Sequence, residues 1–212
     1  MTPPKDVLKA LTKLGMSSTD FDGLTAYVTV LDKWRKRINL IGPGSTDDIW
    51  RRHVLDSAQA WPHILEKDAA LMDLGSGAGL PGLIFSILGA SDVTLVDSDQ
   101  RKAVFLQEAA RAAGVKPRVV AKRFDAALSL EARQYSVVTA RAVASITSLM
   151  PVLSKALKAD GYALLHKGAQ AEKELTEAQK SWTLKYALTP SITGRGGQIV
   201  KIWGIQQDDR GS

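Results

Sequence analysis

The sequence feature that most constrains this chain is an apolar strand, a glycine-rich turn and a helix in direct succession. The apolar run from Ala69 to Leu74 is typical of a buried parallel strand, and an apolar helix pattern resumes at Leu83. Between them stand Gly75, Gly77, Gly79 and Gly82. A glycine has no Cβ, so the chain can turn tightly there and approach a ligand closely. This order of elements predicts a nucleotide-binding cradle.

Two kinds of ligand fit such a cradle. The last three glycines spell G-x-G-x-x-G, the dinucleotide fingerprint, and the first three spell the G-x-G-x-G of class I S-adenosylmethionine (SAM) methyltransferases. Asp73 favours SAM, because its carboxylate would repel a pyrophosphate but suits an ammonium and a sulfonium. The next strand ends in Asp97, which is placed to accept hydrogen bonds from both ribose hydroxyls. We therefore predict SAM as the cofactor, bound by Asp73, Gly75, Ser76, Gly77, Gly79 and Asp97.

The rest of the chain divides into two parts. From Ala69 onward strand and helix patterns alternate, which predicts an α/β class I SAM-dependent methyltransferase fold, Rossmann-like with a mostly parallel seven-stranded sheet. Residues 1–65 show no strand pattern, and apolar residues at helical spacing from Leu24 to Ile38 predict an amphipathic helix. We expect a helical extension over 1–65 packed on a SAM-binding domain over 66–207, with 208–212 as a disordered tail.

A third helix of the extension is predicted to begin at Thr46 and to carry a cluster of polar side chains. His53 and Ser57 share a face of this helix, and Asp56 lies within hydrogen-bonding reach of His53. The cluster is expected to tie the extension to the mouth of the pocket through polar contacts. A solvated helix face remains the alternative, whereas a catalytic triad on a single helix would lack a separate scaffold for an oxyanion hole.

Further candidates follow the later strands at their carboxyl ends, where open α/β sheets bind their ligands. Arg141 follows the strand Tyr135 to Ala140, and Lys167 follows the next strand. After the third strand, Phe124 and Asp125 offer an apolar residue and an acid for adenine, although Asp125 is also compatible with capping a helix.

The net charge of +6 is compatible with a polyanionic partner, and the basic residues are clustered. Trp34 and Trp50 are candidates for stacking on bases, although Trp34 belongs to the apolar stripe. We predict an RNA contact that uses Lys33, Arg35, Lys36, Arg37, Arg51, Arg52, Arg123 and Arg195. No secretory or membrane-spanning pattern is found, so we expect a cytoplasmic protein without a membrane partner, acting as a monomer.

Missing residues narrow the reaction. The chain has no cysteine, which excludes disulfides, thiolate zinc sites and the cysteine addition used in methylating C5 of a pyrimidine. Methylation of an exocyclic amine usually uses an Asn/Asp-Pro-Pro-aromatic turn after the fourth strand, where this chain reads Thr139 to Ala142. The remaining acceptors have their own lone pair, such as a guanine ring nitrogen, or belong to a small molecule or a protein. No metal site is predicted.

Several motifs together resemble the RsmG family, also called GidB. They are Asn39 to Ile41, Arg52 to Ser57, Asp73 to Gly82, Ser136 to Ala144, and Lys167-Gly168. The resemblance spans about Leu24 to Ile205, and it implies SAM-dependent methylation of guanine N7 in 16S ribosomal RNA of the small subunit, within the decoding-region loop. It also implies that Gly75, Leu80, Phe124, Asp125 and Arg141 bind the cofactor, although Phe124 is larger than the aliphatic residues frequent at its position.

This activity agrees with the residues present. Guanine N7 carries a free lone pair and no proton, so its attack on the methyl group needs alignment and electrostatic support but no general base. Arg141 and Lys167 are therefore expected to position the cofactor carboxylate, guanine O6 or phosphate, and to act as neither base nor nucleophile. A non-catalytic RNA-binding or ribosome-assembly protein on the same fold remains an alternative, as does, less favoured, a NAD-binding oxidoreductase.

Overall fold

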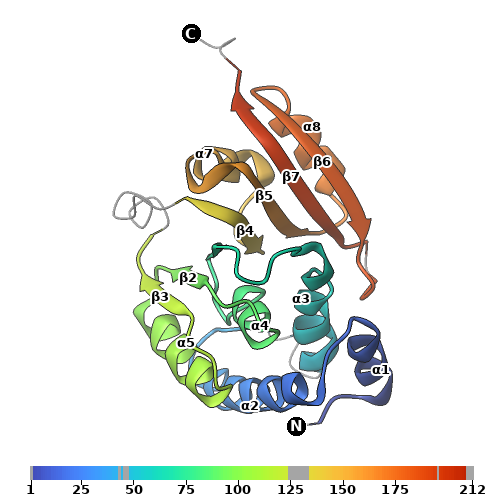
Figure 1. Ribbon diagram of the computed structural model, residues 1–212, viewed down its shortest axis with the longest axis vertical. Coiled ribbons are helices and arrows are strands. Elements are labelled where there is room, and N and C mark those ends of the chain that lie inside the picture. The colour runs from blue at the N-terminus through green and yellow to red at the C-terminus, as the bar shows by residue number, and fades with distance from the viewer. Residues whose placement is uncertain (1, 43, 45–47, 124–133, 195, 209–212) are drawn as a thin grey trace.

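A seven-stranded sheet forms the centre of the computed structural model, which describes residues 2–42, 44, 48–123, 134–194 and 196–208 (Figure 1). The strand order is β3-β2-β1-β4-β5-β7-β6. Strands β1 to β5 are parallel, and β7 pairs antiparallel with both β5 and β6. The strands are β1 Leu71–Leu74, β2 Val93–Asp97, β3 Arg118–Ala121, β4 Tyr135–Arg141, β5 Leu157–Lys167, β6 Trp182–Pro190 and β7 Gln198–Gln207. The predicted fold, with its mostly parallel seven-stranded sheet, is confirmed.

Helices lie on both sides of this sheet (Figure 1). One hydrophobic cluster packs α1 (Lys5–Lys13), α2 (Ser18–Trp34), α4 (Gly82–Ile87) and α5 (Gln100–Ala112) against alternate strand residues such as Leu95. The other cluster packs α7 (Ile146–Ala156) and α8 (Ala171–Ala178) against the intervening residues, such as Val96. The extension therefore shares a core with the helices that follow the first two strands.

Helix α2 has the amphipathic character that its sequence predicts. It begins at a capping box, in which Ser17 and Asp20 each accept a hydrogen bond from the other's backbone N–H. Its buried stripe includes Tyr27 and Leu31. The helix ends at Trp34, earlier than the predicted Ile38.

The third helix differs from the prediction. Its expected N-cap, Thr46, lies outside the described residues, and the chain forms a π-helix, η2 (Trp50–Leu55), then α3 (Asp56–Ala58) and a 3-10 turn, η3 (Trp61–His63). Trp50 is only 2% exposed and so cannot stack on a base. Trp34 packs edge-on against Phe105, with 6.0 Å between ring centroids, as its place in the apolar stripe indicates.

The strands β5, β6 and β7 are longer than predicted. Beyond β7, Asp208 is held by hydrogen bonds from its N–H to the Ser181 carbonyl and from the Thr183 hydroxyl to its carboxylate, and residues 209–212 lie outside the described part. No helix among the described residues is long and apolar enough to cross a membrane. Within the same ranges, no group of three or more His, Asp or Glu side chains could hold a metal ion.

Candidate active site

The glycine-rich turn after β1 has the backbone that only glycine adopts readily. Gly75, Gly77 and Gly79 have φ values of 63°, 53° and 81°. Gly82, at the start of α4, is needed for space instead, because an added Cβ would lie 2.5 Å from the Cβ of Asp73 and 2.6 Å from Leu95. The turn is therefore fixed both by its own conformation and by the strand beneath it.

Asp73 lies under this turn with no exposed surface. One carboxylate oxygen accepts the hydroxyl of Thr139 at 2.7 Å, and the other accepts the N–H of Gly82 at 3.2 Å. Burial raises the pKa of Asp73 to about 6, although these hydrogen bonds oppose the rise. The carboxylate therefore orders the turn from below, and a direct contact with the cofactor stays a prediction.

Asp97, at the end of β2, also contacts the turn. Its carboxylate accepts the N–H of Gly77 at 2.8 Å and the N–H of Asp99 at 2.9 Å. It borders a pocket of about 270 Å³ beside the turn. The pocket is lined by Gly75, Val96, Asp97, Ser98, Lys102, Lys122, Arg123, Ala142 and Val143. This pocket adjoins the predicted cofactor cradle.

The remaining predicted cofactor residues differ in position. Ser76 and Leu80 are 2% and 7% exposed, and the Ser76 hydroxyl donates to the Asp73 carbonyl at 3.0 Å. Their side chains support the turn from inside the protein. Phe124 and Asp125 lie outside the described residues.

Tyr27 links the extension to the same turn. Its hydroxyl donates to the Ala78 carbonyl at 2.7 Å, and the whole side chain is buried. Burial raises the pKa of Tyr27, so the phenol stays protonated and can donate. The N-terminal helix α2 thereby holds the middle of the glycine turn.

A second, larger pocket of about 600 Å³ lies on the other side of the segment that follows β4. Ala142 and Val143 line both pockets, and Ala142 has a φ of 55°, which is uncommon for a residue with a Cβ. The large pocket is also bordered by Arg51, Arg52, Asp56, His166, Lys167 and Gln198. The two pockets thus share one wall, formed by Ala142 and Val143.

Arg141 connects this wall to the extension. Its Nε lies 3.2 Å from the Asp56 carboxylate, its Nη1 donates to Ser57 at 3.2 Å, and its Nη2 donates to the Arg52 carbonyl at 2.6 Å. Its Nη2 also lies 3.1 Å from Nδ1 of His53. Burial and then the Arg141 charge lower the pKa of His53 to about 4, so the imidazole is neutral.

The predicted tie between extension and pocket is therefore confirmed, and the solvated-face alternative is wrong. His53 is 8% exposed and Ser57 is fully buried. The cluster converges on Arg141 because a buried guanidinium needs partners for its N–H groups. Arg141 lines the pocket as predicted, but its contacts within the protein are to the extension.

Asp56 also holds the loop between β6 and β7. Its Oδ1 accepts the Thr193 hydroxyl at 2.8 Å and the Gln59 amide at 2.9 Å. Gln59 in turn donates to Ser191 at 2.9 Å and accepts the N–H of Ile192 at 2.8 Å. One short helix thus fixes two walls of the large pocket.

Lys167 lies at the far wall of the large pocket. Its ammonium donates to Glu174 at 2.8 Å and to the Ala144 carbonyl at 2.5 Å. Nearby, Nε2 of His166 lies 2.9 Å from the Asp56 carbonyl, which requires a proton on Nε2 and leaves Nδ1 as the basic nitrogen. Burial lowers the pKa of His166 to about 4.

The residues predicted to bind RNA lie in different surroundings, and their contact with RNA stays a prediction. Arg51 and Arg52 border the large pocket, where Arg51 pairs with Asp6 and Asp48 and Arg52 donates to the Gly44 carbonyl. Arg123 borders the small pocket instead. At the end of α2, Arg35 and Lys36 pair with Asp32 at 2.6 and 3.3 Å. The Lys33 ammonium lies 3.8 Å from the Glu108 carboxylate, and Arg37 is exposed. Arg195 lies outside the described residues.

Sequence reasoning missed several residues of the site. Tyr27, Gln59 and Thr193 contact it from distant parts of the chain, and no local motif marks them. Lys102 and Lys122 border the small pocket, and only the position of Lys122 next to Arg123 gave a signal.

Comparisons with solved structures support the fold. The ribosomal protein L11 methylase of Lactobacillus delbrueckii subsp. bulgaricus is similar with a TM-score of 0.56 at 16% identity, over 79% of this chain and 84% of that one. A mutant of MtNAS, solved in complex with S-adenosylmethionine, is similar with a TM-score of 0.54 at 11% identity, over 93% of this chain and 71% of that one.

Comparisons of sequence identify the family. The ribosomal RNA small subunit methyltransferase G of Paramagnetospirillum magneticum is 43% identical, over 91% of this chain and 92% of the relative. The enzyme of the same name from Rhodospirillum centenum is 42% identical, over 89% and 86%. The GidB family model, described as rRNA small subunit methyltransferase G, matches residues 21–202. The chain therefore belongs to the GidB family of SAM-dependent ribosomal RNA methyltransferases, and the methyltransferase interpretation of its glycine turn is confirmed.

Proposed function

We propose that this enzyme methylates N7 of a guanine in the 16S ribosomal RNA of the small subunit. The large pocket would receive the guanine, and the turn after β1 would hold SAM across the shared wall at Ala142 and Val143. A pocket of about 600 Å³ has room for a nucleotide.

The observation that carries this proposal is the state of the ionisable groups around the large pocket. Asp56 and Glu174 are already held in ion pairs, the first with Arg141 and the second with Lys167. His166 retains a basic nitrogen, but its lowered pKa makes it a weak base. Such a lining suits an acceptor atom that has no proton to lose, and guanine N7 is such an atom.

Arg141 and Lys167 have positioning roles in this proposal. Arg141 would act through the extension, which it fixes beside the pocket, and Lys167 would orient guanine O6 or a phosphate from the far wall. A guanidinium that gripped both O6 and N7, the usual guanine contact, would block the reaction. The contacts that Arg141 already makes with Asp56, Ser57 and Arg52 argue against such a grip.

Residues 1–65 would serve as a clamp for the substrate RNA, and residues 66–207 as the methyl-transferring part. Arg51 and Arg52 border the acceptor pocket and are the basic side chains of the extension best placed for phosphates. The enzyme would act in the cytoplasm, where its ribosomal substrate lies. We propose that it acts as a monomer.

The test is to incubate the protein with methyl-labelled SAM and small subunits from cells that lack the endogenous enzyme. Mass spectrometry of the digested RNA should find the label in 7-methylguanosine. Arg141→Ala and Arg141→Lys should both lower turnover at saturating SAM, while Lys180→Gln, on the surface beyond α8, should not. Label in another nucleoside would refute the proposal.

A further inference from the structure

The half of the sheet beyond β5 has one face that no helix of the described residues covers. On β7, Val200 and Ile202 point into the core beneath α7 and α8, so Lys201 and Trp203 point to the opposite face. The pairing places Ala187 beside Lys201 and Lys185 beside Trp203, and both β6 residues are exposed. On this face the hydrophobic core reaches β7 only at Ile199.

Aromatic rings and lysines lie together on this face. The Lys201 ammonium is 4.1 Å from the centre of the Tyr162 ring and 6.0 Å from that of Trp203. Tyr162 pairs with Trp203 across β5 and β7, and its hydroxyl is fixed by the His63 carbonyl at 2.9 Å. We call Tyr162, Lys185, Lys201 and Trp203 the open-sheet platform.

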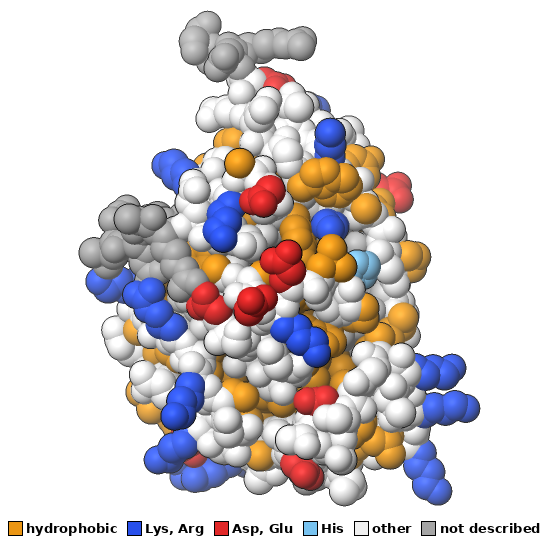
Figure 2. Space-filling model, viewed as in Figure 1, with side chains coloured by type: hydrophobic (Ala, Val, Ile, Leu, Met, Phe, Trp, Pro, Cys, Tyr) orange, Lys and Arg blue, Asp and Glu red, His pale blue; other side chains and the backbone are white. Residues whose placement is uncertain are grey.

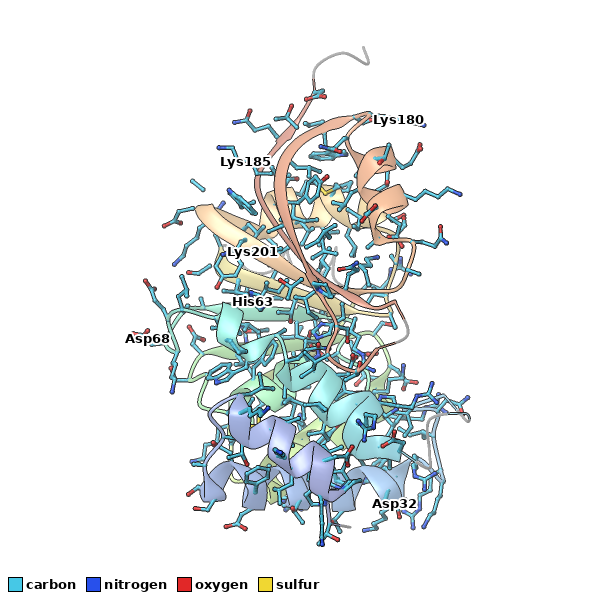
Figure 3. The ribbon with its side chains drawn as sticks, turned by 90° about the vertical axis from the view of Figure 1, so that its right-hand side faces the viewer. Asp32, His63, Asp68, Lys180, Lys185 and Lys201 are labelled. Atoms are coloured by element: carbon cyan, nitrogen blue, oxygen red, sulfur yellow. The ribbon has the colours of Figure 1, made fainter. Side chains whose placement is uncertain are left out.

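The figures show the same arrangement. Figure 2 shows hydrophobic side chains interrupted by lysine over the β5–β7–β6 part of the sheet, with acidic side chains grouped to one side. In Figure 3, Lys185 and Lys201 lie one below the other along one side of the hairpin, whereas Lys180 lies at its opposite side. The platform is thus a defined strip of surface.

Strand β7 connects the platform to the proposed acceptor pocket. Gln198 and Ile199, at the start of β7, border that pocket, and Lys201 and Trp203 follow on the same face as Ile199. From Ile199 to Trp203 the strand advances by about 13 Å, a distance that a short stretch of RNA can span.

We propose that the open-sheet platform binds the strand of ribosomal RNA that leads away from the target guanine, an inference that rests on the proposed function. Trp203 would stack on a base, and Lys185 and Lys201 would contact phosphates, with Lys201 held over the Tyr162 ring. Rings supply the stacking surface that single-stranded RNA seeks, and lysines match the charge of its backbone. A protein partner would not require aromatic rings and lysines side by side.

The experiment measures how tightly the protein binds small subunits and an isolated fragment of 16S RNA. The protein carries S-adenosylhomocysteine, which has no methyl group to transfer, so no turnover occurs. The double variant Lys185→Gln/Lys201→Gln should weaken both interactions about tenfold and flatten their salt dependence. Trp203→Ala should weaken them about tenfold or more, and Trp203→Phe should restore most of the affinity. Lys180→Gln is the control, because it removes one positive charge on the opposite side of the hairpin. It should bind normally.

Unchanged SAM affinity and melting temperature would show that each variant is folded. If the double variant bound both RNAs like the wild type, the proposal would be wrong. Weakened binding to subunits alone, with normal binding to the RNA fragment, would also overturn it and point to a ribosomal protein. Because these assays need no methyl transfer, their failure is distinguishable from a failure to form 7-methylguanosine.

Discussion

Replacing Asp73 with asparagine should change how stability depends on pH. The folded protein raises the pKa of Asp73 from 3.8 to about 6, because its carboxyl group is fully buried. Protonation therefore favours the folded state, and the stabilisation is complete below about pH 4 and lost as the pH rises through 6. A shift of about two pKa units corresponds to about 3 kcal/mol of unfolding free energy.

Urea unfolding between pH 4.5 and pH 7.5 measures this effect. With rising pH, the wild type should lose most of that free energy relative to Asp73→Asn, which cannot ionise. Asp99→Asn is the control, because the hydrogen bond from Arg101 lowers the pKa of Asp99 to about 2, below the range of the experiment. A difference between wild type and Asp73→Asn that stays constant across this range would refute the reasoning.

Cofactor binding gives a second measurement of the same carboxyl group. If the sulfonium of SAM lies near Asp73, its charge favours the ionised carboxylate, and SAM affinity should increase as the pH rises through 6. S-adenosylhomocysteine lacks this charge and should show a weaker dependence, as should Asp73→Asn. Identical pH profiles for the two ligands would place the sulfonium away from Asp73.

Three further substitutions test the contacts around the turn and the pocket. Gly82→Ala should abolish SAM binding and lower stability by about 2 kcal/mol in thermal unfolding, since its Cβ would overlap Asp73. Gly42→Ala should be tolerated, because a Cβ added there would meet nothing within 4 Å. Tyr27→Phe leaves the Ala78 carbonyl unpaired and should cost about 1–3 kcal/mol and weaken SAM binding in calorimetry; unchanged values would contradict a role in the turn. Asp56→Asn should speed hydrogen exchange in residues 191–197 and raise KM for subunits with little change in SAM affinity, and normal exchange would argue against its hold on that loop.

Local patterns in the sequence were sufficient for most of the fold. The turn after β1 could be predicted because its glycines, its strand and its helix are adjacent in the chain, and the sheet followed from alternating apolar runs. The end of α2 was misplaced because the apolar stripe continues to Ile38, which packs on the core without belonging to the helix.

The contacts of Arg141 could not be predicted in this way. Its position after β4 indicated that it faces the pocket, but its partners come from a segment more than 80 residues earlier, at separations of 84 and 89 residues. A motif identifies residue types near one another in sequence, whereas these contacts depend on how η2 and α3 pack against the sheet. Tyr27 lies within the apolar stripe from Leu24 to Ile38, and its spacing does not show where its hydroxyl points.

The hydrogen bond between Tyr27 and Ala78 couples the N-terminal helix α2 to the glycine turn that follows β1. A ligand that orders the glycine turn also holds Tyr27 and, through it, α2 and the turn that joins α2 to α1. Cleavage by a protease in that N-terminal turn should therefore slow when SAM is bound, although the cut lies far from the methyl group. Conversely, removing residues from the amino end should lower the affinity for SAM before it unfolds the sheet.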